Sequence, residues 1–569
     1  MTHPILRTAA ALLLGASILA APVSAQQNDG DPGAYLAGRL ALSEYSYRDA
    51  AYWFSRALVE DEENSFLLEG LILAHLGQGD LPMAAEAAER LVKLGGRSIA
   101  GNIALLVRDV EKEEYTTLLA APPERAIGNL MDKLVLAWAE FGAGKMSDAV
   151  ARFDEIAATD GLKPFGLYHK ALALAAVGDF GAADEILSGQ AAGPLIVNRR
   201  GVIAHAKILS QLERPADALA LLEKSFGNEP EPELMALRRD LEAGKPVPFD
   251  MVTSARDGMA EVLFSLAVAL NGEAEPSYTL LYATSAAALQ PKHTEAVLLV
   301  AGLLEQLGQA ELASEAYGRI SQDDPSFYTA ELGRISTLFA MEKKEEGLAA
   351  LKSLSEAFPD LSLVQMSYGD ALRRDDQFAP AAEAYGKAIA LVGTPEPRHW
   401  GLFYARGVAF ERAGDWEKAE ADFRKALELN PDQPQVLNYL GYSFIDKGQN
   451  LDEAFALIEK AVALQPDQGY IIDSLAWGYF RLGRYEEALA PMEKASLLEP
   501  VDPIVTDHLG DVYWAVGRQM EARFQWRRAL SFDPEEKDAD RIRRKLEIGL
   551  DAVLAEEGAP PLGAASNGN

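Results

Sequence analysis

The residue types that carry out most enzyme chemistry are few in this chain and lie far apart. It has seven histidines, at positions 3, 75, 169, 205, 293, 399 and 508, and no cysteine. Thiol nucleophiles, disulfides and zinc–thiolate sites are therefore excluded. No His-Glu-x-x-His motif occurs, and no two histidines are four residues apart, so no helix offers two imidazoles on one face to a metal ion.

Two short segments resemble catalytic motifs without completing them. Gly142-Ala143-Gly144-Lys145 is similar to the end of a phosphate-binding loop, but the glycine required five residues before Gly144 is Ala139. The tripeptide Asp179-Phe180-Gly181 occurs in kinases, yet no glycine-rich nucleotide loop or catalytic-loop motif accompanies it. Gly-x-Ser-x-Gly is absent. We therefore expect no enzymatic activity, no catalytic residues, no cofactor and no bound metal.

The charge balance narrows the class of partner. The chain has 569 residues, with 53 Lys plus Arg against 86 Asp plus Glu and a net charge of −33. Nucleic acid and anionic membrane surfaces would be repelled. Hydrophobic residues make up 49% and charged residues 24%, as in ordinary folded proteins. A chain this long needs several domains or a repeat array.

The N-terminus has the pattern of a secretory signal. Met1–Arg7 is short and positive, and Ala9–Ala21 is an unbroken run of small and apolar residues. The small residues before Gln26 predict cleavage between Ala25 and Gln26, which makes 1–25 a signal peptide. A membrane anchor would need about 20 apolar residues. A lipoprotein would need a cysteine after the apolar run. We expect an exported, periplasmic protein without a membrane span.

The region from Trp400 to Glu536 repeats with a period of about 34 residues. Gly407, Gly441, Ala476 and Gly510 form one series, and Pro431, Pro466, Pro500 and Pro534 form another. Between them come Phe410, Phe444, Tyr479 and Tyr513, then Gly414, Gly448, Gly483 and Gly517. Such a period indicates stacked pairs of helices, each pair one supersecondary unit.

Each recurring residue type has a mechanical reason. Leu437–Phe444 has apolar residues at helical spacing, so every unit begins with an amphipathic helix. A glycine such as Gly414 ends that helix in the left-handed conformation. Ala419 and Ala426 give the second helix a small face, Phe423 fills the space beside it, and Pro431 ends it.

These spacings resemble the tetratricopeptide repeat, as in Gly407-x2-Phe410-x8-Ala419-x3-Phe423-x2-Ala426-x4-Pro431. Four such matches, this one included, lie in tandem, and weaker ones extend toward the N-terminus. The resemblance implies an all-α, right-handed superhelical α-solenoid of about thirteen helix-turn-helix units.

The pattern divides the chain into regions. We expect a degenerate N-terminal array over 31–232, middle units over 257–399, well-matched units over 400–536, a capping helix over 537–557 and a disordered tail over 558–569. The prolines around 233–256 indicate either an irregular joint between two arrays or a decayed repeat.

In the family that the chain resembles, the first helices line a concave groove for peptides or partner helices. The family's groove positions carry over to Tyr404, Asn438, Tyr442, Asp473, Trp477, Asp507, Asp511 and Trp514. Exposed aromatics would anchor an interface, an Asn amide can bond a peptide backbone, and the aspartates would favour a basic segment. The alternative is that the aromatics fill space between successive first helices.

We therefore expect a periplasmic scaffold or adaptor that binds proteins or peptides. The C-terminal units also resemble envelope adaptors that deliver substrates to processing proteases and so regulate cell-wall hydrolases. A second interpretation is an assembly or export factor for an outer-membrane or exopolysaccharide component. The contrasting class is an enzyme. Partner, affinity and oligomeric state stay open.

Overall fold

A computed structural model describes residues 31–227, 231–559 and 562. The predicted signal peptide, with its cleavage site at Ala25 and Gln26, lies outside these residues, as does most of the predicted tail. No described helix is long and apolar enough to cross a membrane.

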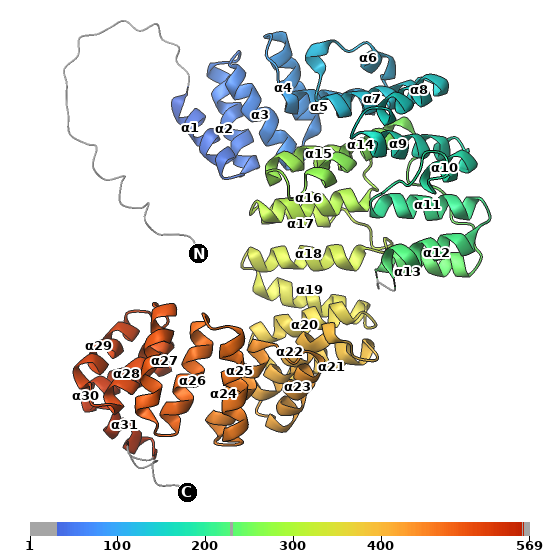
Figure 1. Cartoon of the computed structure of the whole chain (residues 1–569). Helices are drawn as coiled ribbons and strands as arrows, with labels where there is room; N and C mark the ends of the chain where they lie inside the picture. Colours follow the sequence, from blue (N-terminus) through green and yellow to red (C-terminus); the bar gives the residue numbers. More distant parts are fainter. Residues whose placement is uncertain (1–30, 228–230, 560–561, 563–569) are drawn as a thin grey trace, which may run out of the picture. The chain divides into compact units, whose positions relative to one another are not determined.

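The described residues form thirty-one α-helices, two 3-10 helices and one isolated bridge between Asn271 and Ala274, joined by turns and loops (Figure 1). The predicted all-α fold is confirmed. The chain divides into two compact units, one ending at Glu342 and the other beginning at Lys343.

The first unit contains eighteen α-helices. They are α1 (Pro32–Ser43), α2 (Tyr47–Glu60), α3 (Ser65–Gln78), α4 (Leu81–Lys93), α5 (Ile99–Glu111), α6 (Tyr115–Leu119), α7 (Asn129–Gly142), α8 (Met146–Ala157), α9 (Lys163–Ala176), α10 (Phe180–Leu187), α11 (Arg199–Gln211), α12 (Pro215–Phe226), α13 (Pro232–Glu242), α14 (Ala255–Leu270), α15 (Pro276–Leu289), α16 (Thr294–Gln306), α17 (Ala310–Tyr317) and α18 (Phe327–Ala340), with η1 (Pro123–Arg125) after α6.

The second unit is also built from helices, the last of which ends at Glu556. It contains α19 (Lys344–Ala357), α20 (Ser362–Arg374), α21 (Phe378–Leu391), η2 (Pro397–His399), α22 (Trp400–Arg412), α23 (Trp416–Leu429), α24 (Pro434–Lys447), α25 (Leu451–Leu464), α26 (Gly469–Arg481), α27 (Tyr485–Leu498), α28 (Pro503–Ala515), α29 (Gln519–Leu530), α30 (Glu536–Ile548) and α31 (Leu550–Glu556).

The recurring residues of the second unit act as their spacing predicts. Gly414 follows α22 with φ +86°, and Gly448 follows α24 with φ +64°. Phe423 is fully buried, and a Cβ on Gly407 would lie 2.7 Å from its ring. The small residue in the first helix therefore admits the aromatic residue of the second.

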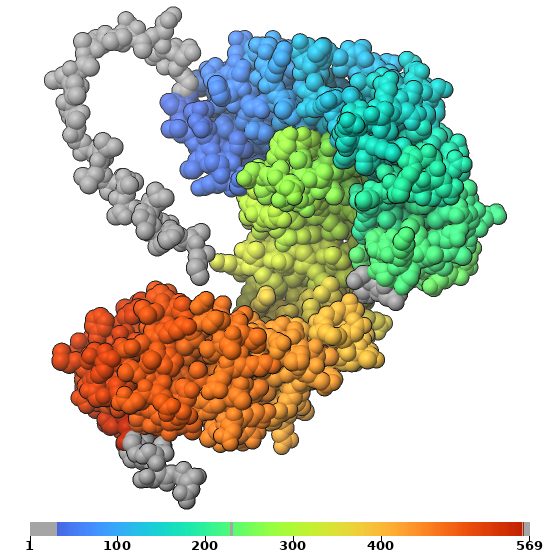
Figure 2. All heavy atoms as spheres, viewed as in Figure 1, coloured from blue at the N-terminus to red at the C-terminus, as the bar shows by residue number. Residues whose placement is uncertain are grey.

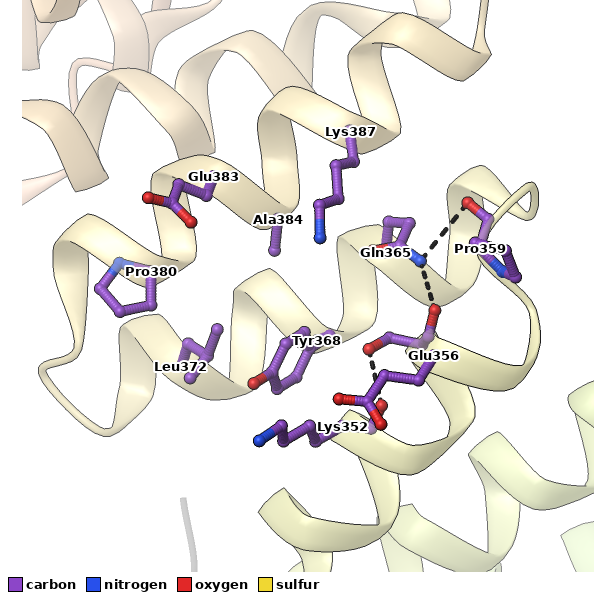
Figure 3. A pocket seen from close by; sticks show the side chains of 11 residues that line it. Lys352, Glu356, Pro359, Gln365, Tyr368, Leu372, Pro380, Glu383, Ala384 and Lys387 are labelled. Carbon is purple, nitrogen blue, oxygen red and sulfur yellow. Dashed lines mark hydrogen bonds between the residues drawn. The ribbon is translucent and has the colours of Figure 1, made fainter.

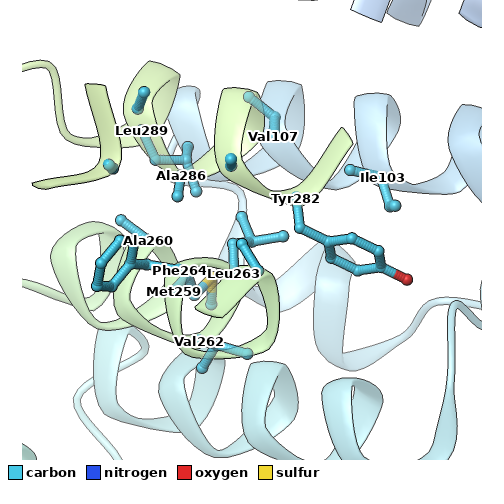
Figure 4. Packing of buried hydrophobic residues seen from close by; sticks show 14 of the residues in the cluster. Ile103, Val107, Met259, Ala260, Val262, Leu263, Phe264, Tyr282, Ala286 and Leu289 are labelled. Carbon is cyan, nitrogen blue, oxygen red and sulfur yellow. The ribbon is translucent and has the colours of Figure 1, made fainter. Parts of the chain in front are cut away.

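The first unit is not a simple continuation of the stack. After α13 the chain returns, and α14 and α15 pack against α3, α5, α7 and α9 (Figure 1). Ile103 and Val107 of α5 meet Tyr282 and Ala286 of α15 in a buried apolar layer (Figure 4). In the space-filling view the green atoms of this segment lie against the blue and cyan N-terminal helices (Figure 2). The Pro-rich stretch is thus a connection inside one compact unit.

A buried carboxylate ties the returning segment in place. Glu261 of α14 is fully buried and accepts hydrogen bonds from Arg200 Nε at 2.6 Å and Tyr168 Oη at 2.9 Å. Burial alone would raise the pKa of Glu261, but Arg200 and the nearby His293 hold it far below its usual value. The ion pair therefore links α14 to α11, and the hydrogen bond from Tyr168 links it to α9.

The predicted capping helix over 537–557 is two helices in the structure. Gly549, with φ +84°, separates α30 from α31. The apolar stripe of 542, 546, 550 and 554 continues through both, which is why the sequence alone indicates one helix.

Candidate partner-binding site

The predicted groove residues lie on the first helices of four successive pairs, which we call the first-helix row: α22, α24, α26 and α28. Within it, α24 contacts α26 and α26 contacts α28. Tyr404, Asn438, Asp473 and Asp507 occupy the same place on the four helices, and Tyr442, Trp477 and Asp511 lie one turn later. The near-constant period places one face of each helix on the same side of the row.

The centre of the row is an aromatic and ionic cluster. The Trp477 ring stacks on His508, with centroids 3.9 Å apart and planes 12° from parallel, and on Phe480 at 4.7 Å. His508 Nδ1 lies 3.0 Å from Asp473 Oδ1. Burial alone would lower the pKa of His508, but Asp473, with Asp507 and Asp511, raises it overall.

His508 was not identified as a site residue from the sequence. Its only signal is its position beside Asp507, 35 residues after Asp473. A lone histidine in a helix reads as packed or solvated. The structure shows it packed, with both a ring partner and a carboxylate partner.

Three other predicted residues lie on α22 and α24. Burial, with the charges of Asp473 and Asp446, raises the pKa of Tyr442 to about 12. Asn438 is 8% exposed, and its Oδ1 has no hydrogen-bond partner among the described residues. The half-buried ring of Tyr404 lies 6.0 Å from Phe423, so it contributes to packing between the helices.

Two predicted carboxylates already have a basic partner in the same chain. Lys545 of α30 is fully buried and donates to both oxygens of Asp507 and of Asp511, at 2.7–2.8 Å. Asp511 also accepts from Trp526 Nε1 at 2.9 Å. Burial and the neighbouring Asp511 raise the pKa of Asp507, although Lys545 opposes them. Helix α30 thus supplies, within the same chain, the basic group that the aspartates were expected to find in a partner.

The expectation that Trp514 stands exposed is wrong. Trp514 is only 9% exposed, and its Nε1 donates to Asp551 Oδ2 at 2.7 Å. The reason is α31, which covers the indole. Asp551 belongs to the short helix after Gly549, which the repeat pattern does not describe.

Two exposed residues on the row were missed. Tyr470 is 41% and Ile504 39% exposed, and each lies three residues before a predicted aspartate, Asp473 or Asp507. The 34-residue separation of Tyr470 and Ile504 is the signal that could have found them. Together with the partly exposed Tyr442 and Trp477, they form what we call the aromatic surface.

A separate cavity of about 370 Å³ lies between α19, α20 and α21 (Figure 3). Lys352, Glu356, Glu383 and Lys387 give it charges of both signs, and Gln365 Nε2 donates to the Ser355 carbonyl at 2.9 Å. Within the described ranges no three His, Asp or Glu side chains are grouped so that they could hold a metal ion.

Comparison with known proteins finds repeat proteins. The family model for the tetratricopeptide repeat matches residues 404–469. A TPR repeat-containing protein of Pseudomonas aeruginosa is 27% identical over 183 residues, which are 32% of this chain and 30% of that protein. A photosystem I assembly protein of Acaryochloris marina is 35% identical over 89 residues, 16% of this chain and 53% of that protein. The chain thus spans only a third to a half of these relatives.

Among solved structures, a tetratricopeptide repeat protein from Parabacteroides merdae is 19% identical, with 45% of this chain and 97% of that chain covered and a TM-score of 0.38. Yeast Tom70 is 15% identical, with 93% and 99% covered and a TM-score of 0.34.

Proposed function

We propose that this chain, which belongs to the tetratricopeptide-repeat proteins, is a scaffold that holds a segment of another protein against the aromatic surface of its second unit. Such repeat proteins mediate protein–protein interactions. The finer assignment, to the first-helix row and to the residues named below, is our proposal.

The observation that carries it is the aromatic surface itself. Large, partly exposed aromatic and aliphatic side chains anchor interfaces, because burying them against a partner removes much apolar area from water. Tyr442, Tyr470, Trp477 and Ile504 recur at repeat spacing on three neighbouring helices. The stacking of Trp477 on His508 fixes its ring, so little rotamer freedom would be lost on binding.

The polar groups beside this surface suggest how the backbone of a bound segment is held. Asn438 Oδ1, buried and unpartnered within the described residues, is an acceptor that a peptide N–H could satisfy. Because the charge of Asp473 is met by His508, the site does not require a basic partner. We therefore favour an apolar segment over the basic one expected from the aspartates.

The first helices of the N-terminal array are a weaker candidate. Their row is already covered by α14 and α15, with buried apolar contacts and the Glu261 ion pair. A partner would have to displace a segment of the same chain. We therefore place partner binding in the second unit.

We propose further that the protein acts in the periplasm, since residues 1–25 have the pattern of a secretory signal. An adaptor for an envelope protease that acts on cell-wall hydrolases fits an exported repeat scaffold. An assembly or export factor is the second candidate, since one partial relative is named an assembly protein. Sequencing the N-terminus of the mature protein and fractionating cells test the location.

Site-specific photocrosslinking in cells tests the partner surface. A crosslinking residue at Tyr470 or Ile504 is expected to trap one and the same protein. The matched control is Leu497 of α27, which is 81% exposed but lies on a second helix. Trp477→Ala should abolish the adduct while circular dichroism stays helical. Identical products from Leu497 and Tyr470 would refute the site.

A further inference from the structure

We infer that the surface beneath α31 is a second docking site, that it takes a short acidic amphipathic helix, and that α31 occupies it in cis. This deepens the proposed function, since the site lies at the end of the same first-helix row. The surface is built from Trp514 of α28, Arg523 of α29, and Arg541 and Arg544 of α30.

The chain turns sharply to bring α31 onto Trp514. Gly549 has φ +84° and ψ 158°, and a Cβ there would lie 2.7 Å from Trp514 Cζ2. Backbone therefore lies directly against the indole, in a conformation that disfavours other residues. The backbone at Gly549 thus contacts the indole ring as a bound ligand would, and not through the side-chain packing that joins successive helical pairs.

The apolar side of α31 is its anchor. Leu550 is fully buried and Val553 is 3% exposed, one helical turn apart. Leu550 joins the cluster that contains Phe480, Trp514 and Trp526, and Leu554 and Leu562 pack at its edge. Two apolar side chains at i and i+3 are the usual way for a short helix to bind a groove.

The polar side of α31 meets basic and donor groups at every point. Asp551 accepts from Trp514 Nε1 at 2.7 Å. Glu556 accepts from Arg544 Nη2 at 2.6 Å, and Glu557 from Arg541 Nε at 2.7 Å. The Arg523 guanidinium lies over the Trp514 ring, 5.4 Å from its centroid. In a chain of net charge −33, this concentration of arginines selects an acidic occupant.

The length of α31 makes the occupancy reversible. It has seven residues, and a helix so short is marginal on its own. Its connection to α30 gives it a high local concentration, which an external segment must overcome. An external acidic helix would therefore bind weakly while α31 is seated, and more tightly once it is released.

The probe is a labelled synthetic peptide of residues 549–562, and the receptor is the full chain. Leu550→Asp combined with Val553→Asp should unseat α31, which faster proteolysis after Gly549 would report. We expect the peptide to bind this variant about tenfold or more tighter than it binds the wild type, because competition in cis is removed. Adding Trp514→Phe should weaken that binding.

A second variant guards against misfolding. Glu556→Lys with Glu557→Lys reverses the acidic contacts and leaves the buried leucine and valine in place, so it should release α31 with the core intact. Failure of the peptide to bind either released variant overturns the inference, and so does equal binding of a scrambled peptide. Since this assay needs no cellular partner, it can fail while crosslinking at Tyr470 succeeds, or the reverse.

Discussion

A single ammonium group, that of Lys545, neutralises two buried carboxylates at the end of the first-helix row. Both Asp507 and Asp511 lie within 2.8 Å of its Nζ. Removing one partner from a buried ion cluster leaves uncompensated charge in a poorly solvated place. The cluster therefore makes α30 part of the folded stack and not a loosely attached cap.

Lys545→Met is expected to lower the free energy of unfolding of the second unit by about 3 kcal/mol or more. Denaturant titration followed by circular dichroism measures it. The matched control is Lys537→Met, an exposed lysine on the same helix, whose effect should stay within about 0.5 kcal/mol. Equal effects of the two substitutions would show that the buried cluster contributes little.

His508 should make stability depend on pH in a defined direction. Because its folded pKa lies above the ordinary 6.5, the protonated form is favoured by folding. Its contribution is fully present below pH 6.5 and is lost as the pH rises through the folded pKa. Thermal unfolding from pH 6 to 9 should show this fall.

This loss of stability has its cause in the carboxylates of Asp473, Asp507 and Asp511, which attract the protonated imidazole and no longer do so once it is deprotonated. His508→Gln should flatten the pH profile of the melting temperature relative to the wild type. His399→Gln, in the same unit, should leave its shape unchanged. A wild-type profile that rises from pH 6.5 to 8 would contradict the assignment.

Residue roles were only partly predictable from the sequence. The period of about 34 residues predicts equivalent positions for Tyr442 and Trp477, and the two residues lie on the first helices α24 and α26. It could not show that Trp514 would be covered, because the cover follows from a turn at Gly549 outside the repeat. It also could not distinguish paired from unpaired aspartates, since their partner Lys545 lies on a helix beyond the last repeat.

At the scale of the helical pair, α22 contains two glycines in different surroundings. A Cβ on Gly407 would lie 2.7 Å from the buried Phe423 ring, whereas no atom of the described residues lies within 4 Å of the position a Cβ would take on Gly401. The first glycine is required by packing between the two helices. The second carries only the conformational cost of glycine in a helix.

Gly407→Ala should therefore destabilise the second unit by about 1–3 kcal/mol through overpacking. Gly401→Ala should leave it unchanged or stabilise it by less than about 1 kcal/mol. Thermal and denaturant unfolding of the two variants side by side checks the difference. If neither substitution changed the free energy of unfolding, the Phe423 ring could move aside without cost. The hypothesis that packing requires a glycine at position 407 would then be wrong.

At this scale the sequence was a good guide to the second unit. The glycine after α22 and the prolines after α23, α25 and α27 fall where the helices end. It was a poorer guide where an apolar stripe continues across the end of a helix, as it does at Gly549 between α30 and α31. Periodicity reports which face is apolar, and it does not report one residue with a positive φ.

At the scale of the whole first unit, the return of α14 and α15 was beyond the reach of repeat spacing. A repeat pattern specifies contacts between neighbours in the chain. The packing of Tyr282 against the layer of Ile103 and Val107 joins residues far apart in sequence. Only the apolar character of α14 and α15 hinted at burial on more than one side.

Glu261 tests whether this return is held by its ion pair. Glu261→Gln leaves the shape of the side chain but removes the charge that faces the buried Arg200. Arg200 keeps a second partner in Glu295, at 2.8 Å. We therefore expect the free energy of unfolding to fall by about 3 kcal/mol, near the lower end for a broken buried ion pair. Hydrogen exchange should show faster opening of α9, α11 and α14, with α22 to α29 unaffected.

The control is Glu273→Gln, an exposed carboxylate just after α14, which should change neither the free energy of unfolding nor the exchange rates. Unchanged protection of α14 in the Glu261 variant would mean that the apolar layer alone holds α14 and α15 against the first helices of the N-terminal array. The ion pair would then affect only the orientation of these two helices.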